Sequence, residues 1–211
     1  MTKWVNSRFL TLLVLWPMGS LYSFGLDLYI PVVPHLTDVF AISQETVQWW
    51  TLSMYMLLFG SVQLVAGPII DRQGRRRVAN GAFLGFVIGC VLAAIAHSVV
   101  MLSIGRMLQA VGGCMTYVVA YATIRDLYAT ENARTTMFSL LTGIIGLSPL
   151  LAPLLAAALA LRFGWPSVFW ILGGWALFGW VMMLLFYQDQ HVESKQDDRL
   201  WHNFRHILSQ R

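Results

Sequence analysis

The sequence has few charged residues and only two cysteines. Charged side chains make up 11% of its 211 residues, whereas a typical soluble domain carries about 25%. This shortage excludes a conventional water-exposed surface. Cys90 and Cys114 both lie in apolar stretches, and neither has a neighbour at metal-ligand spacing. We therefore expect neither a zinc site nor a disulfide framework, and no metal ion or other cofactor.

Long apolar stretches make up most of the sequence. Hydrophobic residues make up 57% of the chain, and a bilayer core of roughly 30 Å needs about 20 apolar residues per helix. Six such stretches occur, at about 9–30, 43–66, 78–96, 99–125, 136–161 and 167–187. They predict an all-α integral membrane protein with six transmembrane helices, which form one domain over residues 1–187. Pro31 and Pro34 are expected to end the first helix, and Ser43 is expected to cap the second. We interpret the first stretch as a retained helix, because no small-residue cleavage site follows it.

The last 24 residues, 188–211, are polar and are predicted to form a cytoplasmic linker or tail. Leu200, Trp201, Phe204, Ile207 and Leu208 recur at helical spacing among basic residues, which is typical of an amphipathic helix on a membrane surface. A solvated tail without helix is the alternative.

Basic residues are distributed unevenly between the connections. Twelve of the fourteen Lys and Arg residues lie in the terminal segments and in every second connection, Arg162 lies in the opposite connections, and Arg106 lies within a helix. Basic loops stay in the cytoplasm, so both termini are predicted to be cytoplasmic. The net charge of +4 therefore reflects membrane orientation, and we expect no nucleic-acid partner.

Two charged side chains lie well inside predicted spans, Asp27 in the first and Arg106 in the fourth. Both reach similar depths, and each shares a helix face with other polar or small residues: Ser20 and Ser23 beside Asp27, and Gln109, Gly113 and Tyr117 beside Arg106. Insertion of a charged side chain at the centre of a transmembrane helix costs about 2.5–3.5 kcal/mol, so such a residue is interpreted first as functional. Facing polar stripes would line a water-filled cavity in which Asp27 gains and loses a proton. Alternatively, Asp27 caps the first helix and Arg106 satisfies backbone carbonyls.

The connection after the second span carries the most specific pattern. Residues 67–77 read Gly-Pro-Ile-Ile-Asp-Arg-Gln-Gly-Arg-Arg-Arg. This segment resembles the signature of the major facilitator superfamily, G-x-x-x-D-R-x-G-R-R, and has every fixed position of it: Gly67, Asp71, Arg72, Gly74, Arg75 and Arg76. The two glycines would allow a tight turn, and Asp71 would accept hydrogen bonds from arginines or from a neighbouring helix. Such a cluster, together with Arg125 at the end of the fourth span, could hold the cytoplasmic side closed, although a basic loop could also serve orientation alone.

Further segments resemble parts of the same superfamily. Residues 102–112, with Arg106 and Gln109, resemble its fourth-helix motif, whose arginine is implicated in proton transfer. Gly143, Gly146, Pro149 and Pro153 resemble the antiporter motif of the fifth helix, although Ser148 replaces the glycine before the proline. Residues 26–31, including Tyr29, and 122–128, including Arg125, resemble the bicyclomycin-resistance and chloramphenicol-resistance branch of drug:proton antiporters.

The resemblance implies half of a twelve-helix fold, arranged as two inverted repeats of three helices. A weak similarity relates two connections: Arg72-Gln-Gly74 follows the second span, and Arg162-Phe-Gly164 follows the fifth. Chance could also produce a similarity of this length. The implied function is proton-coupled multidrug efflux across the bacterial inner membrane by alternating access, which confers antibiotic resistance. The site residues would be Asp27, Arg106, Gln109 and Tyr29.

The implied partners are the lipid bilayer, small amphipathic drugs and protons. A second six-helix half or a homodimer mate would complete the transporter, or the chain is a truncated half. The alternative is a regulatory membrane interaction protein without transport of its own. Enzymatic activity is not expected, because no nucleophile, metal cluster or phosphate-binding loop appears at usable spacing.

Overall fold

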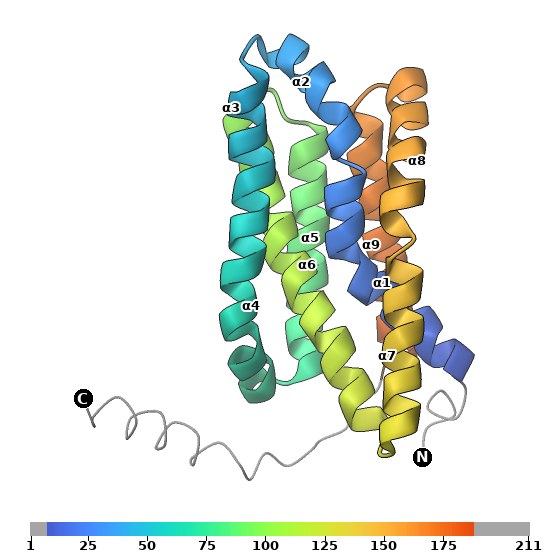
Figure 1. Ribbon diagram of the computed structural model, residues 1–211. Coiled ribbons are helices and arrows are strands. Elements are labelled where there is room, and N and C mark those ends of the chain that lie inside the picture. The colour runs from blue at the N-terminus through green and yellow to red at the C-terminus, as the bar shows by residue number, and fades with distance from the viewer. Residues whose placement is uncertain (1–7, 188–211) are drawn as a thin grey trace, which may run out of the picture.

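The computed structural model describes residues 8–187, which form an elongated bundle of helices (Figure 1). Six helical segments of this range are long and apolar enough to cross a membrane: Arg8–Phe40, Gln44–Gln73, Arg75–Ala94, Val99–Leu127, Glu131–Phe163 and Pro166–Phe186. The predictions of an all-α protein and of six spans are confirmed. The predicted surface helix around Leu200–Leu208 and the proposed tail domain, 188–211, lie outside the described residues.

Three of the six spans contain more than one helical element. The first comprises α1 (Arg8–Asp27), a short turn η1 (Ile30–Val32) and α2 (Val33–Phe40). The second comprises α3 (Gln44–Gln48), a π-helical turn η2 (Trp49–Ser53) and α4 (Met54–Gln73), and the fifth comprises α7 (Glu131–Ile145) and α8 (Ser148–Phe163). The third, fourth and sixth are single helices, α5 (Arg75–Ala94), α6 (Val99–Leu127) and α9 (Pro166–Phe186).

The end of the first span differs from the prediction. Pro31 and Pro34 were expected to end helical geometry after Ile30, but α1 ends earlier, at Asp27, and helical structure then resumes to Phe40. Each proline stands in the first turn of a new helix, where its missing N–H would have had no partner within that helix. The predicted cap of the second span is confirmed, since the Ser43 hydroxyl accepts a 3.3 Å hydrogen bond from the backbone N–H of Thr46.

The second and third spans meet more abruptly than the sequence indicated. α4 continues to Gln73, so Gly67, Asp71 and Arg72 belong to the helix, and Gly74 alone connects α4 to α5. The expectation that Gly67 contributes to the turn is wrong. Gly74 has φ 85°, in a region that favours glycine, and one residue reverses the chain because glycine lacks a Cβ that would clash there.

The centre of the bundle is formed by α6, which packs against α1, α4 and α5. Its closest contact with α5 involves two glycines: a Cβ on Gly89 would lie 2.6 Å from the carbonyl oxygen of Gly105. Of the three glycines that recur along α5, Gly81 and Gly85 have nothing within 4 Å of such a Cβ. Small residues thus let two backbones touch at one level of the bundle.

The second and fifth spans lie at the margin of the bundle. Only 17% and 22% of the residues in their most apolar windows are buried, compared with 56% in the fourth span. Figure 1 shows α4 on one flank and α7 with α8 on the other. These two flanks therefore leave apolar side chains available to lipid or to another protein unit.

Candidate functional site

Arg106 of α6 is completely buried, and its guanidinium contacts aromatic rings. One of its terminal nitrogens donates 2.8 Å hydrogen bonds to the carbonyl oxygen of Gly25 and to Oε1 of Gln109. The guanidinium carbon lies 4.3 Å from the ring centroid of Tyr29 and 4.1 Å from that of Tyr55. Two ring faces thus stabilise the charge through cation–π contacts, which strengthen when the pair is removed from water.

Irregular backbone at two places positions these rings. Tyr29 follows the end of α1, and its hydroxyl shares a hydrogen bond with the hydroxyl of Thr51 in the π-helical turn η2. Tyr55, one turn further along, donates a 3.1 Å hydrogen bond to the carbonyl oxygen of Tyr22. The π turn thus brings Thr51 and Tyr55 toward the end of α1, in keeping with the frequent occurrence of π turns at functional sites.

Asp27 is the last residue of α1, is 7% exposed and lies two residues beyond the carbonyl group that Arg106 contacts. Its Oδ2 accepts a 2.6 Å hydrogen bond from the hydroxyl of Ser148, the first residue of α8. The structure thus brings Asp27 and Arg106 to one level, as predicted, while their side chains have different partners. The position of Asp27 at the helix end and the bond from Arg106 to a carbonyl also agree with the alternative structural interpretation.

A cavity of about 390 Å³ opens beside this level, lined by α1, α4, α6 and the α7–α8 region. Four of its ten lining residues are aromatic and form two close pairs: the ring centroids of Tyr22 and Phe59 are 3.5 Å apart, and those of Tyr117 and Tyr121 are 4.5 Å apart. The lining residues are Tyr22, Ser23, Phe59, Gln63, Tyr117, Tyr121, Thr142, Ile145, Gly146 and Pro149.

The cavity includes only part of the two predicted polar stripes. Ser23 and Tyr117 line it, whereas Ser20 accepts a 2.9 Å hydrogen bond from Trp175 on α9. Gln109 is buried between Arg106 and the thiol of Cys90, to which its amide donates at 3.3 Å. The structure therefore places Arg106, Gln109 and Tyr29 in a buried cluster behind the cavity wall.

Several lining residues were missed by sequence reasoning. Tyr22, Phe59 and Thr142 resemble ordinary core residues in an apolar span, and nothing in the sequence distinguishes them. Two other lining residues could have been predicted from the sequence. Gln63 is a polar residue in an apolar span, and Tyr121 follows Tyr117 by one helical turn, which places both tyrosines on one helix face.

The predicted antiporter-like segment is where the fifth span breaks. A continuous helix over 136–161 was expected, but α7 ends at Ile145 and α8 begins at Ser148. Gly146 lies in the break, Pro149 in the first turn of α8 and Pro153 inside α8, while Gly143 is exposed near the end of α7. A proline two residues after the break cannot continue the hydrogen bonding of α7, because it has no backbone N–H.

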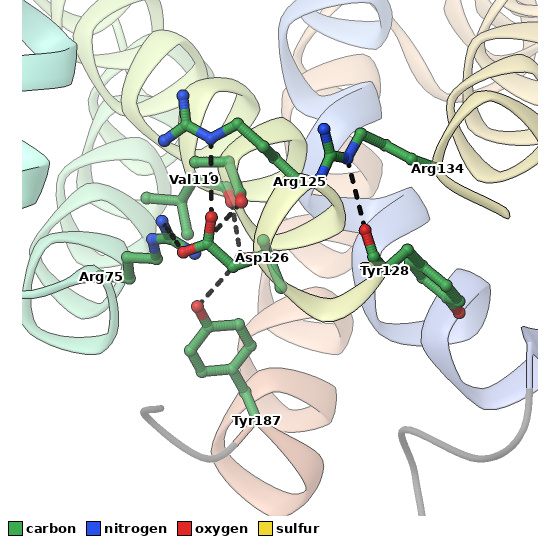
Figure 2. A network of polar contacts seen from close by, with 9 residues as sticks. Arg75, Val119, Arg125, Asp126, Tyr128, Arg134 and Tyr187 are labelled. Carbon is green, nitrogen blue, oxygen red and sulfur yellow. Dashed lines mark hydrogen bonds and ion pairs between the residues drawn. The ribbon is translucent and has the colours of Figure 1, made fainter. Parts of the chain in front are cut away.

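A second polar cluster joins helices at the opposite end of the bundle (Figure 2). Arg75, the first residue of α5, forms an ion pair with Asp126 and donates a 3.1 Å hydrogen bond to the carbonyl oxygen of Ala122. Arg125 lies 3.5 Å from the other carboxylate oxygen of Asp126. Nearby, Arg134 donates to the carbonyl oxygen of Tyr128 at 3.3 Å.

Sequence reasoning identified the arginines of this cluster but not their acceptor. Asp71 was expected to accept from arginines, whereas Asp126 pairs with Arg75 and Arg125, and the side chains of Asp71, Arg72 and Arg76 lie on the exposed surface of the described bundle. The role expected of Asp71 in closing the cytoplasmic side stays a prediction. Arg75 starts α5 at the α4–α5 turn, so its ion pair connects that turn with the end of α6.

The comparisons with known proteins agree with this geometry. The sequence model of the Major Facilitator Superfamily matches residues 15–211. The chain belongs to the Major Facilitator Superfamily.

Curated relatives of this superfamily include proteins named for drug resistance. A chloramphenicol resistance protein of Pseudomonas aeruginosa is 34% identical over 171 residues, which cover 81% of this chain and 41% of the relative. A multidrug resistance protein MdtL of Klebsiella pneumoniae (strain 342) is 34% identical over 154 residues, covering 73% of this chain and 39% of the relative. The chain thus spans about two fifths of the length of these relatives.

Solved structures show the fold of the superfamily. A mutant of the peptide transporter POT in complex with alafosfalin superimposes with a TM-score of 0.72 and 17% sequence identity. The match covers 96% of this chain and 45% of the transporter. The six spans therefore have the fold of slightly less than half of a superfamily transporter.

Within residues 8–187, no group of three or more His, Cys, Asp or Glu side chains is arranged to hold a metal ion. Arg106 donates from one terminal nitrogen to Gly25 and Gln109, whereas its Nε and its other terminal nitrogen are buried without a hydrogen-bond partner among the described residues, and Asp27 accepts from Ser148. The arrangement offers one buried carboxylate, one buried cation and an aromatic cavity. These are the chemical elements for binding an amphipathic molecule and for exchanging a proton.

Proposed function

We propose that this chain is a six-helix unit of a transporter that exports small amphipathic drugs in exchange for protons. The observation that carries this proposal is the position of Asp27, a nearly buried carboxylate at the level of an aromatic cavity. Tyr22 and Ser23, about one turn before Asp27, line that cavity, as do Gly146 and Pro149 beside its partner Ser148. Drug and proton would therefore bind within a short distance of each other.

The walls of the cavity support an amphipathic substrate. The lining residues include three tyrosines, one phenylalanine and a glutamine, and none of the ten carries a formal charge at neutral pH. Aromatic faces bind both apolar rings and organic cations, while tyrosine hydroxyls and an amide accept or donate single hydrogen bonds. Such a surface would select by size and amphipathic character more than by one defined hydrogen-bond pattern.

Transport by alternating access would need a second six-helix unit, from the same or another polypeptide. The flanks formed by α4 and by α7 with α8 would contact that unit, since their apolar side chains are largely unburied on either side of the cavity. In such an assembly the ion pair between Arg75 and Asp126 would lie at the cytoplasmic end. The membrane would be the bacterial inner membrane, with both termini in the cytoplasm, as the basic loops predict.

A membrane protein that binds and regulates a complete transporter is the second candidate. It is favoured by the low burial of the second and fifth spans, 17% and 22% in their most apolar windows, which leaves two faces free to pack against another membrane protein. The same unburied flanks would then contact the regulated transporter.

Reconstitution of the purified chain in liposomes tests the proposal. An inward-directed or outward-directed proton gradient is imposed, and the accumulation of a fluorescent amphipathic drug is followed, with Asp27→Asn as the matched variant. Gradient-driven accumulation by the parent and its loss in Asp27→Asn would support a proton-coupled exporter. Absence of accumulation, also when a partner unit is co-reconstituted, would reject the exporter and favour the regulatory function.

A further inference from the structure

The hydrogen-bond partner of Asp27 is the residue that departs from the antiporter-like pattern. Ser148 stands where that pattern has glycine, and its hydroxyl donates a 2.6 Å hydrogen bond to Oδ2 of Asp27. The serine is 2% exposed and the aspartate 7%, so water has little access to the contact. A glycine at position 148 would have no side-chain donor.

We propose that Ser148 is a positioning residue that holds the Asp27 carboxylate and favours its ionised form. This inference rests on the proposed function, in which Asp27 exchanges a proton. A hydrogen bond donated to a carboxylate stabilises the charged state relative to the neutral acid. Removal of the hydroxyl therefore increases the share of Asp27 that carries a proton at a given pH.

The break between α7 and α8 explains why a side chain is needed there. Ser148 begins α8, a helix of 16 residues, and the positive end of the α8 dipole favours a nearby carboxylate. Backbone N–H groups usually provide the hydrogen bonds at such a helix start. Pro149 has no N–H, so the first turn of α8 offers one donor fewer, and the hydroxyl of Ser148 supplies a donor in the same region.

Within residues 8–187, the side-chain hydrogen bond described for Asp27 is the one from Ser148, and the ionisable groups nearby have other partners or lie further away. Arg106 directs its hydrogen bonds to Gly25 and Gln109, the hydroxyl of Tyr55 donates to the carbonyl oxygen of Tyr22, and Tyr22 itself lines the cavity. The packed helix α9 contains no ionisable side chain. The charged residues described in α7 and α8 lie toward the ends away from the break, namely Glu131, Arg134 and Arg162, and the nearby His35 and Asp38 of α2 are exposed.

The position of Ser148 also links Asp27 with the cavity. Gly146, two residues before Ser148, and Pro149, directly after it, both line the cavity. A drug that contacts these residues acts on the backbone that holds the serine. Occupancy of the cavity and protonation of Asp27 are thereby connected through one short segment.

Infrared spectroscopy of the purified 211-residue chain in lipid nanodiscs tests this inference. The carbonyl band of protonated Asp27 is identified by its loss in Asp27→Asn, and the ratio of protonated to ionised Asp27 is then measured across pH. We expect Ser148→Ala and Ser148→Gly to raise this ratio about ten- to a hundredfold at a given pH, the range expected for one hydrogen bond to a charged group. Ser148→Thr, which keeps the hydroxyl, should restore the parental ratio.

Ser61→Ala serves as the matched control, because the Ser61 hydroxyl donates to the carbonyl oxygen of Leu57 within α4 and does not contact Asp27. Thermal unfolding of each variant shows whether the bundle is intact, and Ser148→Gly provides the measurement if Ser148→Ala does not fold. An unchanged ratio in a folded variant without the hydroxyl overturns the inference. A changed ratio in a chain that never transports drug would reject the exporter while retaining the role of Ser148 toward Asp27.

Discussion

Gly74 and Gly164 occupy equivalent connections in the two halves of the bundle, and both have positive φ angles, 85° and 80°. Gly74 joins the second and third spans, and Gly164 joins the fifth and sixth. Each glycine directly follows the last helix of its span. The similarity between Arg72-Gln-Gly74 and Arg162-Phe-Gly164 had indicated such a correspondence. The shared geometry is what two repeats of three helices would produce.

Substitution of Gly74 by valine should destabilise the bundle and impair transport in any assembly that contains it. A β-branched side chain at this φ costs about 1–3 kcal/mol, and relief of that strain would alter the turn that positions Arg75. Gly67→Val is the matched control, since Gly67 lies within α4 and a Cβ there meets nothing within 4 Å. Thermal unfolding in detergent and drug transport would be compared, and equal behaviour of the two variants would contradict a special role for the turn.

Substitution of Gly89 by alanine should lower the free energy of unfolding by about 1–3 kcal/mol, the usual cost of overpacking. The added methyl group would meet the backbone of Gly105 at 2.6 Å, and backbone cannot move aside as a side-chain end can. Gly85→Ala on the same helix has open space and should stabilise the helix by up to about 1 kcal/mol. Chemical unfolding in mixed micelles measures both. Similar losses at the two positions would show that the contact of α5 with α6 is not the cause.

Arg75 and Asp126 should be energetically coupled. Their side chains are 18% and 20% exposed, so solvent screens the ion pair only in part. A double-mutant cycle with Arg75→Gln and Asp126→Asn should give a coupling energy of about 0.5–3 kcal/mol in unfolding, reduced at high salt. Arg76→Gln, at an exposed position beside Arg75, provides the comparison and should show no coupling to Asp126.

Asp27 should release a proton when drug binds. In Asp27→Asn, introduced into a complete assembly, folding should be retained, because an amide keeps the shape and much of the hydrogen-bonding capacity of the carboxylate while it cannot titrate. Proton release on drug binding, measured with a pH indicator in weakly buffered solution, should fall toward zero. Release equal to that of the parent would identify Asp27 as a structural cap of α1.

The turn between α4 and α5 should face the cytoplasm. A cysteine introduced at Gln73, which is exposed beside Gly74, should react with a membrane-impermeant thiol reagent only after the inner membrane is opened. The native Cys90 and Cys114 are buried and should react little. Labelling of Gln73→Cys from outside intact cells would reverse the predicted orientation.

The six spans could be predicted from the sequence because the requirement for them is local. A helix that crosses lipid must satisfy its own backbone and be apolar over its length, so composition in a window of about 20 residues reveals it. The one-residue turn at Gly74 was also predictable in kind, because its backbone conformation selects glycine. The residues at which the turn begins and ends were not predictable. The motif from Gly67 to Arg72 is polar enough to suggest a loop, yet it lies in α4.

The similar depth of Asp27 and Arg106 was predictable from the sequence, since depth follows from position along a helix of known rise. Their partners were not predictable, because they depend on how the helices pack. The carboxylate of Asp27 meets Ser148, 121 residues away, and the guanidinium of Arg106 contacts two tyrosine rings, Tyr29 of the first span and Tyr55 of the second. Such pairings depend on the rotation and breaks of packed helices, namely the π turn at Trp49–Ser53 and the interruption before Ser148. Pro149 is a local signal for the interruption, but it does not indicate which side chain will meet Asp27, and the π turn contains no proline or glycine that would mark it in the sequence. The partners of both charges are therefore set only when the helices pack.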